Sequence, residues 1–445
     1  MNLQTSLSRQ LENPNLNRNQ RAELCCELAR VFEDRGDYES ARETLGEFWR
    51  HIGEHPDTSG LEQVTAGEVL LRAGFLTSIL GSKNQITGAQ ETAKNLFSES
   101  LTIFESLGYG KKIAEAQTEL ALCYWREGAY DEARVMLRDA LSRLSTESEL
   151  KAKAILRSAI VEYWAAQHGR AFRILTDNAA LFEKLNNHTL IGSFHDTLAG
   201  LLEDSGTPEY TDRAFVEYAA ASYHFEQAGH KYYRAHVENN LGFLYFKVGR
   251  YAEAHEHLNY ARRLLMYLKD SYGVAENNET RARVFLAEGN YPEAEKIAGS
   301  AVSTLEKSGQ QGLLAEALIT YGTALARLGY YGKAHVVFEH AIEVSQQAGA
   351  VSHAKDAALK MVQELSGKIS GEAQVTPSSG SLDEDIRSYE RNLIKEALTK
   401  ARGSISQAAR LLGTSHQELA YILSTRQKDL MPLRTPAKSR RKRKP

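Results

Sequence analysis

Apolar and polar positions between residues 21 and 365 follow a helical spacing, and a glycine interrupts this spacing at near-regular intervals. Around each interruption the chain reads Gly, any residue, Tyr, any two residues and Ala, and the last three copies are 40 residues apart. Weaker copies near residues 88–93, 169 and 210–214 fill the same spacing. A fixed period of this length predicts a stacked array of helix pairs. The five clear copies are Gly36-Tyr38-Ala41, Gly128-Tyr130-Ala133, Gly249-Tyr251-Ala254, Gly289-Tyr291-Ala294 and Gly329-Tyr331-Ala334.

The residues that flank each glycine predict two helices joined by a tight turn. We expect the glycine to end the first helix, and a small residue seven positions earlier to let the second helix approach closely. An apolar residue follows nine positions after the glycine. The gap between the first copy and Gly88 is 52 residues, so we expect an insertion at residues 51–60. The small residues are Ala29, Ala121, Gly242 and Gly322, and the apolar residues are Leu45, Leu137, Leu258 and Phe338.

These repeats resemble the tetratricopeptide repeat family, in a long-helix variant with a period near 40. The resemblance covers residues 21–365, after a polar lead-in at residues 1–20, and implies an all-α solenoid of about eight helix pairs. Family members hold a peptide or protein segment in the concave groove that their first helices line. The predicted groove residues are Glu115, Glu119, His236, Asn239, Asn240, Glu276, Arg283, Glu316 and Thr320, with Arg30 and Arg126 among further candidates.

Two features of the groove candidates bear on the ligand. The Lys/Asn cluster with which family members clamp a C-terminal carboxylate is not evident, so a basic or neutral ligand is expected. The alternative interpretation is that the glutamates only stabilise the starts of the first helices.

The remaining composition predicts a soluble cytoplasmic protein. The first 20 residues contain no apolar segment typical of a signal peptide, and no apolar run approaches the roughly 20 residues that a membrane span needs. Neighbouring positions in a helix point in different directions, so Cys25 and Cys26 should not pair, and with Cys123 they suggest a reducing compartment. No metal or cofactor is expected.

The C-terminal part differs in composition. Residues 366–382 are rich in Gly, Ser and Thr and predict a flexible linker. Residues 383–430 then predict three helices, because an apolar stripe ends at Gly403 and two Ser-x-x-Gln/Glu capping boxes follow at residues 404–407 and 415–418. Two short capped helices separated by a glycine form a helix-turn-helix.

The stretch from Glu390 to Ser415 closely resembles the Fis-type helix-turn-helix of bacterial regulators, and its last helix is expected to enter the major groove of duplex DNA. The resemblance also implies a homodimer. Residues 416–424 depart from the family because they contain no Lys or Arg, although Gln417 could pair with adenine. The predicted DNA contacts are Ser404, Ser406, Gln407, Arg410, Thr414, Ser415, His416, Gln417, Tyr421, Arg426, Lys428, Arg440, Arg441, Lys442 and Arg443.

Charge is unevenly distributed between the two parts. Residues 386–445 carry a net charge of +11, which leaves −14 on the rest. The basic tail at residues 431–445 is expected to be disordered and to lie along phosphates, which would associate the protein with the nucleoid. The acidic solenoid could also hold this tail until a partner fills the groove. Two alternatives remain: the tail is a nonspecific polyanion-binding segment, or the module serves packing or dimerisation, which an outward Tyr421 and Ile422 would fit.

Enzyme motifs are missing from the sequence. There is no Gly-rich phosphate loop, and His255-Glu256-His257 has the wrong spacing for a zinc protease. His51 and His55 lie in the expected insertion and are not expected to bind a metal. The sequence therefore predicts a non-enzymatic DNA-binding, transcription-associated regulator that couples a peptide-binding solenoid to a helix-turn-helix. The alternative is a protein-interaction scaffold.

Overall fold

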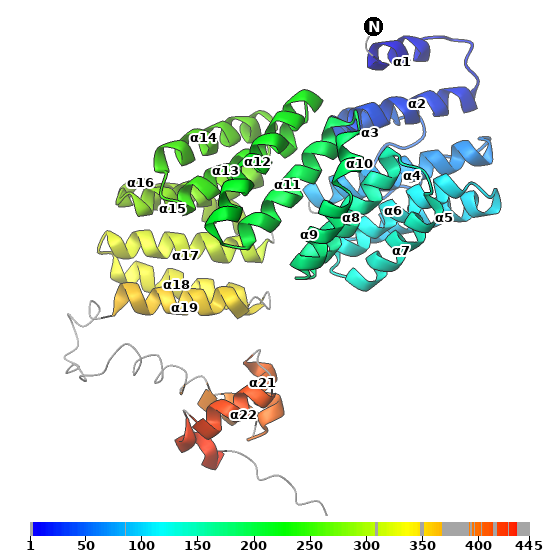
Figure 1. Cartoon of the computed structure of the whole chain (residues 1–445). Coiled ribbons are helices and arrows are strands. Elements are labelled where there is room, and N and C mark those ends of the chain that lie inside the picture. The colour runs from blue at the N-terminus through cyan, green and yellow to red at the C-terminus, as the bar shows by residue number, and fades with distance from the viewer. Residues whose placement is uncertain are drawn as a thin grey trace, which may run out of the picture. The chain divides into compact units, whose positions relative to one another are not determined.

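The computed structural model describes residues 3–84, 86–307, 310–347, 351–366, 391, 394–395, 397–401, 403–412, 416–425 and 427–433. Within these residues the regular elements are helices, and no strand occurs (Figure 1). The chain forms two compact units, Met1–Asn290 and Tyr291–Pro445. The predicted all-α solenoid with a C-terminal helix-turn-helix is confirmed, while the basic tail lies outside the described residues.

The first unit consists of consecutive antiparallel helix pairs. Each pair combines a first helix with a second helix, in the order α2/α3, α4/α5, α6/α7, α8/α9, α11/α12 and α13/α14, and α15 follows. The predicted insertion lies in the non-helical stretch between α3 and α4. The bounds are α1 (Leu3–Leu11), α2 (Arg18–Glu33), α3 (Tyr38–Thr44), α4 (Gln63–Lys83), α5 (Ala89–Ser106), α6 (Gly110–Arg126), α7 (Tyr130–Arg143), α8 (Glu149–Trp164), α9 (His168–Asp177), α10 (Ala179–Glu183), α11 (His188–Asp204), α12 (Pro208–Ala228), α13 (Lys231–Lys247), α14 (Tyr251–Tyr267) and α15 (Ser271–Ala287).

The second unit begins with further packed helices and ends in a smaller helical module. Helices α17 and α18 form a pair, α16 packs on α17, and α19 packs on both members of the pair. In the described part of the module, two short helices and a 3-10 helix follow a helical segment that precedes Gly403. The bounds are α16 (Tyr291–Leu305), α17 (Gln311–Arg327), α18 (Tyr331–Gln347), α19 (Val351–Leu365), α21 (Ile405–Leu411), α22 (His416–Thr425) and η1 (Lys428–Leu433).

Each motif glycine lies in the turn between the two helices of a pair. Gly36, Gly128, Gly249, Gly289 and Gly329 have φ values between 70° and 85°, a region that favours residues without a Cβ. The weak repeat at α8/α9 reaches the same region with Ala166, at a φ of 57°. The turn geometry is therefore kept where the sequence motif is lost.

The small and apolar motif positions contact each other within a pair. A Cβ built on Gly242 in α13 would lie 2.5 Å from Leu258 in α14, and one built on Gly322 would lie 3.0 Å from Phe338. These apolar residues are fully buried. The predicted close approach of the two helices is thus confirmed, because no larger residue fits at these glycines without displacing its neighbour.

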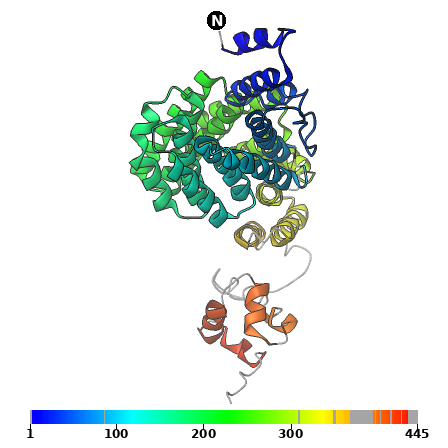
Figure 2. The same cartoon turned by 90° about the vertical axis from the view of Figure 1, so that its right-hand side faces the viewer.

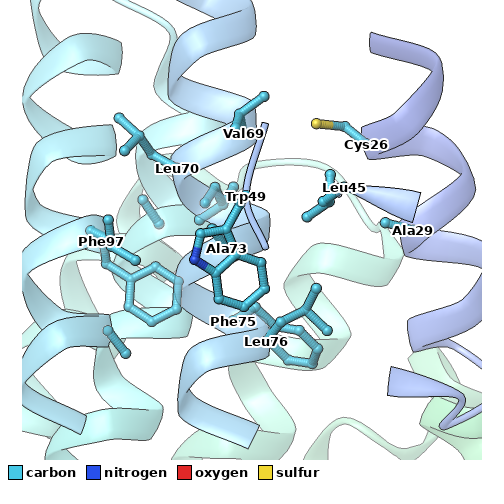
Figure 3. Packing of buried hydrophobic residues seen from close by; sticks show 14 of the residues in the cluster. Cys26, Ala29, Leu45, Trp49, Val69, Leu70, Ala73, Phe75, Leu76 and Phe97 are labelled. Carbon is cyan, nitrogen blue, oxygen red and sulfur yellow. The ribbon is translucent and has the colours of Figure 1, made fainter. Parts of the chain in front are cut away.

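Helix α4 forms the centre of the first apolar core. Its residues Val69, Leu70, Ala73 and Leu76 are fully buried and pack in one cluster with Phe97 of α5 (Figure 3). Contrary to the sequence-based expectation, α4 is long and apolar enough to cross a membrane, with a mean hydropathy of 1.3 over an 18-residue window. However, 83% of that window is buried inside the solenoid, as in a core helix.

The first unit winds until its first helix pair meets later helices (Figure 2). Thr189 in α11 donates a hydrogen bond of 2.5 Å to the carbonyl oxygen of Asp34. His230, the N-cap of α13, packs edge-on against Tyr38, with ring centroids 6.3 Å apart. His230 is fully buried, and burial lowers its pKa to about 3, so the ring is neutral at this contact. A Cβ built on Gly36 would lie 2.5 Å from the His230 ring.

This closing contact predicts a difference between two otherwise equivalent glycines. Gly36→Ala and Gly249→Ala both place an alanine at positive φ, which costs about 1–2 kcal/mol. Only Gly36→Ala also collides with His230, because no atom lies within 4 Å of a Cβ built on Gly249. We expect Gly36→Ala to lower the free energy of unfolding by about 1–3 kcal/mol more than its control, measured by urea unfolding. Equal losses would contradict the closing contact.

Candidate functional sites

The first helices of the early repeats carry a network of buried ion pairs. Arg72 in α4 is 2% exposed and contacts Glu33 of α2 at 2.6 Å and Glu115 of α6 at 2.7 Å. Glu115 also pairs with Arg30 at 3.1 Å and with Lys112 at 3.0 Å. The predicted groove residue Glu115 thus connects three first helices, rather than stabilising a helix start.

Glu119 occupies an equivalent position one turn further along α6. It is fully buried and accepts from Lys153 at 2.6 Å and from Arg157 at 2.7 Å, both in α8. Burial alone would raise the pKa of Glu115 and Glu119, but their cationic neighbours lower both values to about 2. Both side chains are therefore ionised, and their charges are already neutralised by the protein.

Arg126, at the end of α6, is a cation without such neutralisation. Its guanidinium donates to the carbonyl oxygen and the hydroxyl of Ser78, both at 2.7 Å. In the part of the chain that the structure describes, no carboxylate oxygen lies within 4.0 Å of it. Burial lowers its pKa, and Tyr233 and Tyr38 lie within electrostatic range. Arg126 therefore retains capacity to bind an anionic group.

Helices α11 and α13 hold an acidic group that has no cationic partner within the described residues. Asp196 in α11 is partly exposed and interacts with the side chain of Asn240 in α13. Removal from water raises the pKa of Asp196 to about 7, and the hydrogen bond with Asn240 only partly offsets this effect. Sequence analysis missed Asp196 because its repeat lacks the clear motif that places groove positions.

The remaining groove candidates of the first unit divide into structural and accessible residues. Asn239 is buried and accepts a hydrogen bond of 2.9 Å from Asn277, so it joins α13 to α15. His236 packs against Tyr232, with centroids 4.5 Å apart. Arg283 lies over the ring of Phe243 at 4.9 Å, and Glu276 interacts electrostatically with Tyr232. His236, Glu276 and Arg283 are only half-buried and can face a ligand.

The last two groove candidates belong to α17 in the second unit. Glu316 is half-buried and lies 3.3 Å from His353 of α19, whereas Thr320 is buried.

Three of the histidines noted in the sequence bond to nearby glutamates. His255 bonds to Glu288 at 2.8 Å, His257 to Glu238 at 2.7 Å and His55 to Glu99 at 2.8 Å. Within the described residues, no group of three or more His, Cys, Asp or Glu side chains is arranged to hold a metal ion. The three cysteines are buried free thiols.

The buried network predicts a large cost for removing one ion. Arg72→Met leaves Glu33 buried without its cation and should destabilise the protein by about 3–5 kcal/mol. Arg30→Met removes a 45% exposed partner of the same Glu115 and should cost about 1 kcal/mol or less. Adding Glu33→Gln to Arg72→Met should recover part of the loss. Urea unfolding measures all three, and similar losses for both single variants would contradict the network.

Asp196 predicts a pH dependence of stability. Its pKa is about 7 in the fold, against about 3.9 in an unfolded chain, so the folded state binds more protons between these values. Stability is therefore lost as pH rises from 4 to 7. Asp196→Asn should lose less free energy of unfolding between pH 5 and pH 8 than the unmodified protein. Asp212→Asn, at an exposed position in α12, is the control, and equal pH slopes in all three proteins would contradict this assignment.

The C-terminal module has an apolar core of its own. Ile394 and Leu398 from the helical segment before Gly403 pack with Ile405 of α21 and with Leu419 and Leu423 of α22. Ser404 accepts a hydrogen bond of 3.4 Å from the Gln407 amide, which confirms the N-cap part of the first predicted capping box. The second box lies outside the described side chains.

Helix η1 completes the module beyond the predicted helix-turn-helix. Leu430 is 3% exposed and belongs to the core, and Asp429 forms an ion pair with Arg391. The module therefore extends to residue 433, slightly past the predicted boundary at residue 430.

Among the side chains of α22 that the structure describes, the exposed ones are Tyr421, Ser424 and Thr425, none of which is cationic. Tyr421 is 64% exposed, and the hydroxyls of Ser424 and Thr425 both donate to the Tyr421 carbonyl oxygen. Gln407 and Lys428 are exposed and Ser404 is half-buried. The other predicted DNA contacts have positions or side chains outside the described residues: Ser406, Arg410, Thr414, Ser415, His416, Gln417, Arg426, Arg440, Arg441, Lys442 and Arg443.

Comparison with known families agrees with both parts of the fold. Residues 114–143 match the tetratricopeptide repeat, and residues 386–422 match the family described as bacterial regulatory protein, Fis family. Fold and matches together define a tetratricopeptide solenoid protein with a C-terminal regulatory module. More particularly, that module is a Fis-type helix-turn-helix. Among curated proteins, none matches the sequence.

Solved structures with a similar fold are tetratricopeptide-like solenoids. A Rap protein complexed with Competence and Sporulation Factor is 13% identical, with a TM-score of 0.51 over 81% of this chain and 91% of that one. The apo form of the quorum sensor NprR from B. thuringiensis is 10% identical, with a TM-score of 0.52 over 76% and 91%. A signal-transduction ATPase with a tetratricopeptide repeat sensor from Pyrococcus horikoshii is 13% identical, with a TM-score of 0.53 over 82% and 62%. At these identities the likeness concerns the fold.

Proposed function

We propose that this protein is a DNA-binding, transcription-associated regulator in which a peptide-binding solenoid is coupled to the helix-turn-helix. The observation that carries the proposal is a Fis-type module, with its own core and N-cap, on the same chain as the repeat array. The two matched domain families are regulatory and repeat domains rather than enzymatic ones, which supports a non-enzymatic role. The similar Rap structure is complexed with Competence and Sporulation Factor, which supports a ligand-binding role for the solenoid.

The proposed ligand site is formed by the first helices of the first unit. Glu115 and Glu119 are engaged in ion pairs, so they hold the helices of the site together rather than bind the ligand. The ligand is instead contacted by half-buried residues such as His236, Asn240 and Glu276. Within the described residues, Asp196 and Arg126 have no ion-pair partner, so each can receive an ion of opposite charge from a peptide.

A second candidate function is a protein-interaction scaffold. It is favoured by the exposed Tyr421 and by Leu411, which is 59% exposed, because apolar side chains on a helix-turn-helix suit a protein contact better than a phosphate backbone. The same two side chains would suit a homodimer of the module.

Duplex-DNA binding at several salt concentrations distinguishes these functions. We expect the full chain to prefer a selected duplex, and His416→Ala/Gln417→Ala to reduce that preference by about tenfold, since a specific base contact contributes about 1–3 kcal/mol. A chain that ends at residue 433 should bind more weakly and with a smaller salt dependence, because the tail cations are lost. The cut belongs after residue 433, since Leu430 is part of the core.

Two other outcomes would contradict the regulator proposal. Binding without sequence preference that disappears with the tail would make the tail a nonspecific anchor. If nothing binds at low salt, the scaffold is supported instead, and Tyr421→Ala should then disrupt association with a protein partner.

A further inference from the structure

A second surface of the first unit, separate from the proposed ligand site, contains a cavity. It has a volume of about 450 Å³ and lies over α8, between the second helices α7 and α9. This volume lies within the range of about 300–1,000 Å³ that is typical of small-ligand sites. Leu141, Ile155 and Ile174 supply apolar lining from all three helices.

The charged groups around this cavity are unbalanced. Its carboxylate, Glu162, is 3% exposed and is already neutralised by two bonds of 3.0 Å from Arg134 and by Arg170 at 3.2 Å. Arg138 and Lys151 also line the cavity. Throughout the described chain, neither of them has a carboxylate oxygen within 4.0 Å. Among the lining residues, four cations thus accompany one carboxylate, and Arg134 also pairs with the exposed Asp131 at 2.6 Å.

The cations are distributed along the length of the cavity. Lys151 and Glu162 are 11 residues apart on α8, a rise of about 16 Å. Lys151 therefore lies near one end and the Arg134–Glu162–Arg170 group near the other. An extended segment of about five residues spans this length. Its acidic side chains would reach the cations while an apolar side chain covers Leu141, Ile155 and Ile174.

We propose that the cavity between α7 and α9 binds an extended acidic peptide segment of a partner protein. This segment has an apolar residue between its carboxylate side chains. Charge complementarity selects the acidic residues, and the apolar lining selects the residue between them. A phosphate backbone would leave that lining unused. This proposal does not depend on a ligand at the first helices or on DNA binding by the module.

The test uses a fluorescein-labelled peptide with the sequence Glu-Asp-Leu-Asp-Glu and the full chain, followed by fluorescence anisotropy. We expect saturable binding that weakens with salt, and a weaker complex when the peptide's leucine is replaced by glycine. Arg138→Glu/Lys151→Glu should weaken binding by about tenfold or more. The control Arg143→Glu/Arg173→Glu makes the same charge change on exposed positions of α7 and α9 outside the cavity, and should change affinity by about twofold or less.

Three outcomes would overturn the proposal. Equal losses in the two double variants would show a general charge effect. Unchanged affinity of the glycine-containing peptide would exclude the apolar contact and does not depend on the folding of any protein variant. Displacement of the peptide by a short DNA duplex would assign this surface to nucleic acid.

Discussion

The contact between the Gly36 turn and the His230 ring determines which surface of the first unit is enclosed. It joins residues that are almost two hundred positions apart, and it leaves room for no side chain at the turn. Helix pairs on opposite sides of the first unit therefore face one another, and charged side chains on the first helices are shielded from solvent. Buried charges are tolerated only when they are paired, and the network around Arg72, Glu115 and Glu119 meets this requirement.

Unlike these paired charges, Asp196 and Arg126 have no ion-pair partner among the described residues. Removal from water raises the pKa of the Asp196 carboxyl group to about 7, and among the described residues the Arg126 guanidinium donates to Ser78. An acidic and a basic group at these two places suit a peptide ligand with both a cationic and an anionic group. This differs from the expectation of a basic or neutral ligand, because Arg126 supplies the anion-binding group that no Lys/Asn cluster provides.

Much of the fold could be predicted because its rules are local. The glycine turn, the small residue before it and the apolar residue after it contact each other within about 16 positions, as at Gly242 and Leu258. The closing contact could not be predicted, since it depends on small rotations accumulated over several repeats. The site was harder still. Asn239 occupies a groove position but bonds to Asn277, and Arg72 is a buried cation within an apolar helix. Only the three-dimensional structure shows which of these residues hold helices together and which can contact a ligand.

The proposed function requires the Fis-type module of this solenoid protein to contact DNA through α21 and α22. Hydrogen–deuterium exchange of the full chain, with and without a selected duplex, tests this contact most directly, because it reports protection of individual helices. We expect slower amide exchange over residues 405–425 when DNA is bound, with little change in helices α2 to α15. Unchanged exchange over α21 and α22 at saturating DNA, with protection in the solenoid instead, would contradict it.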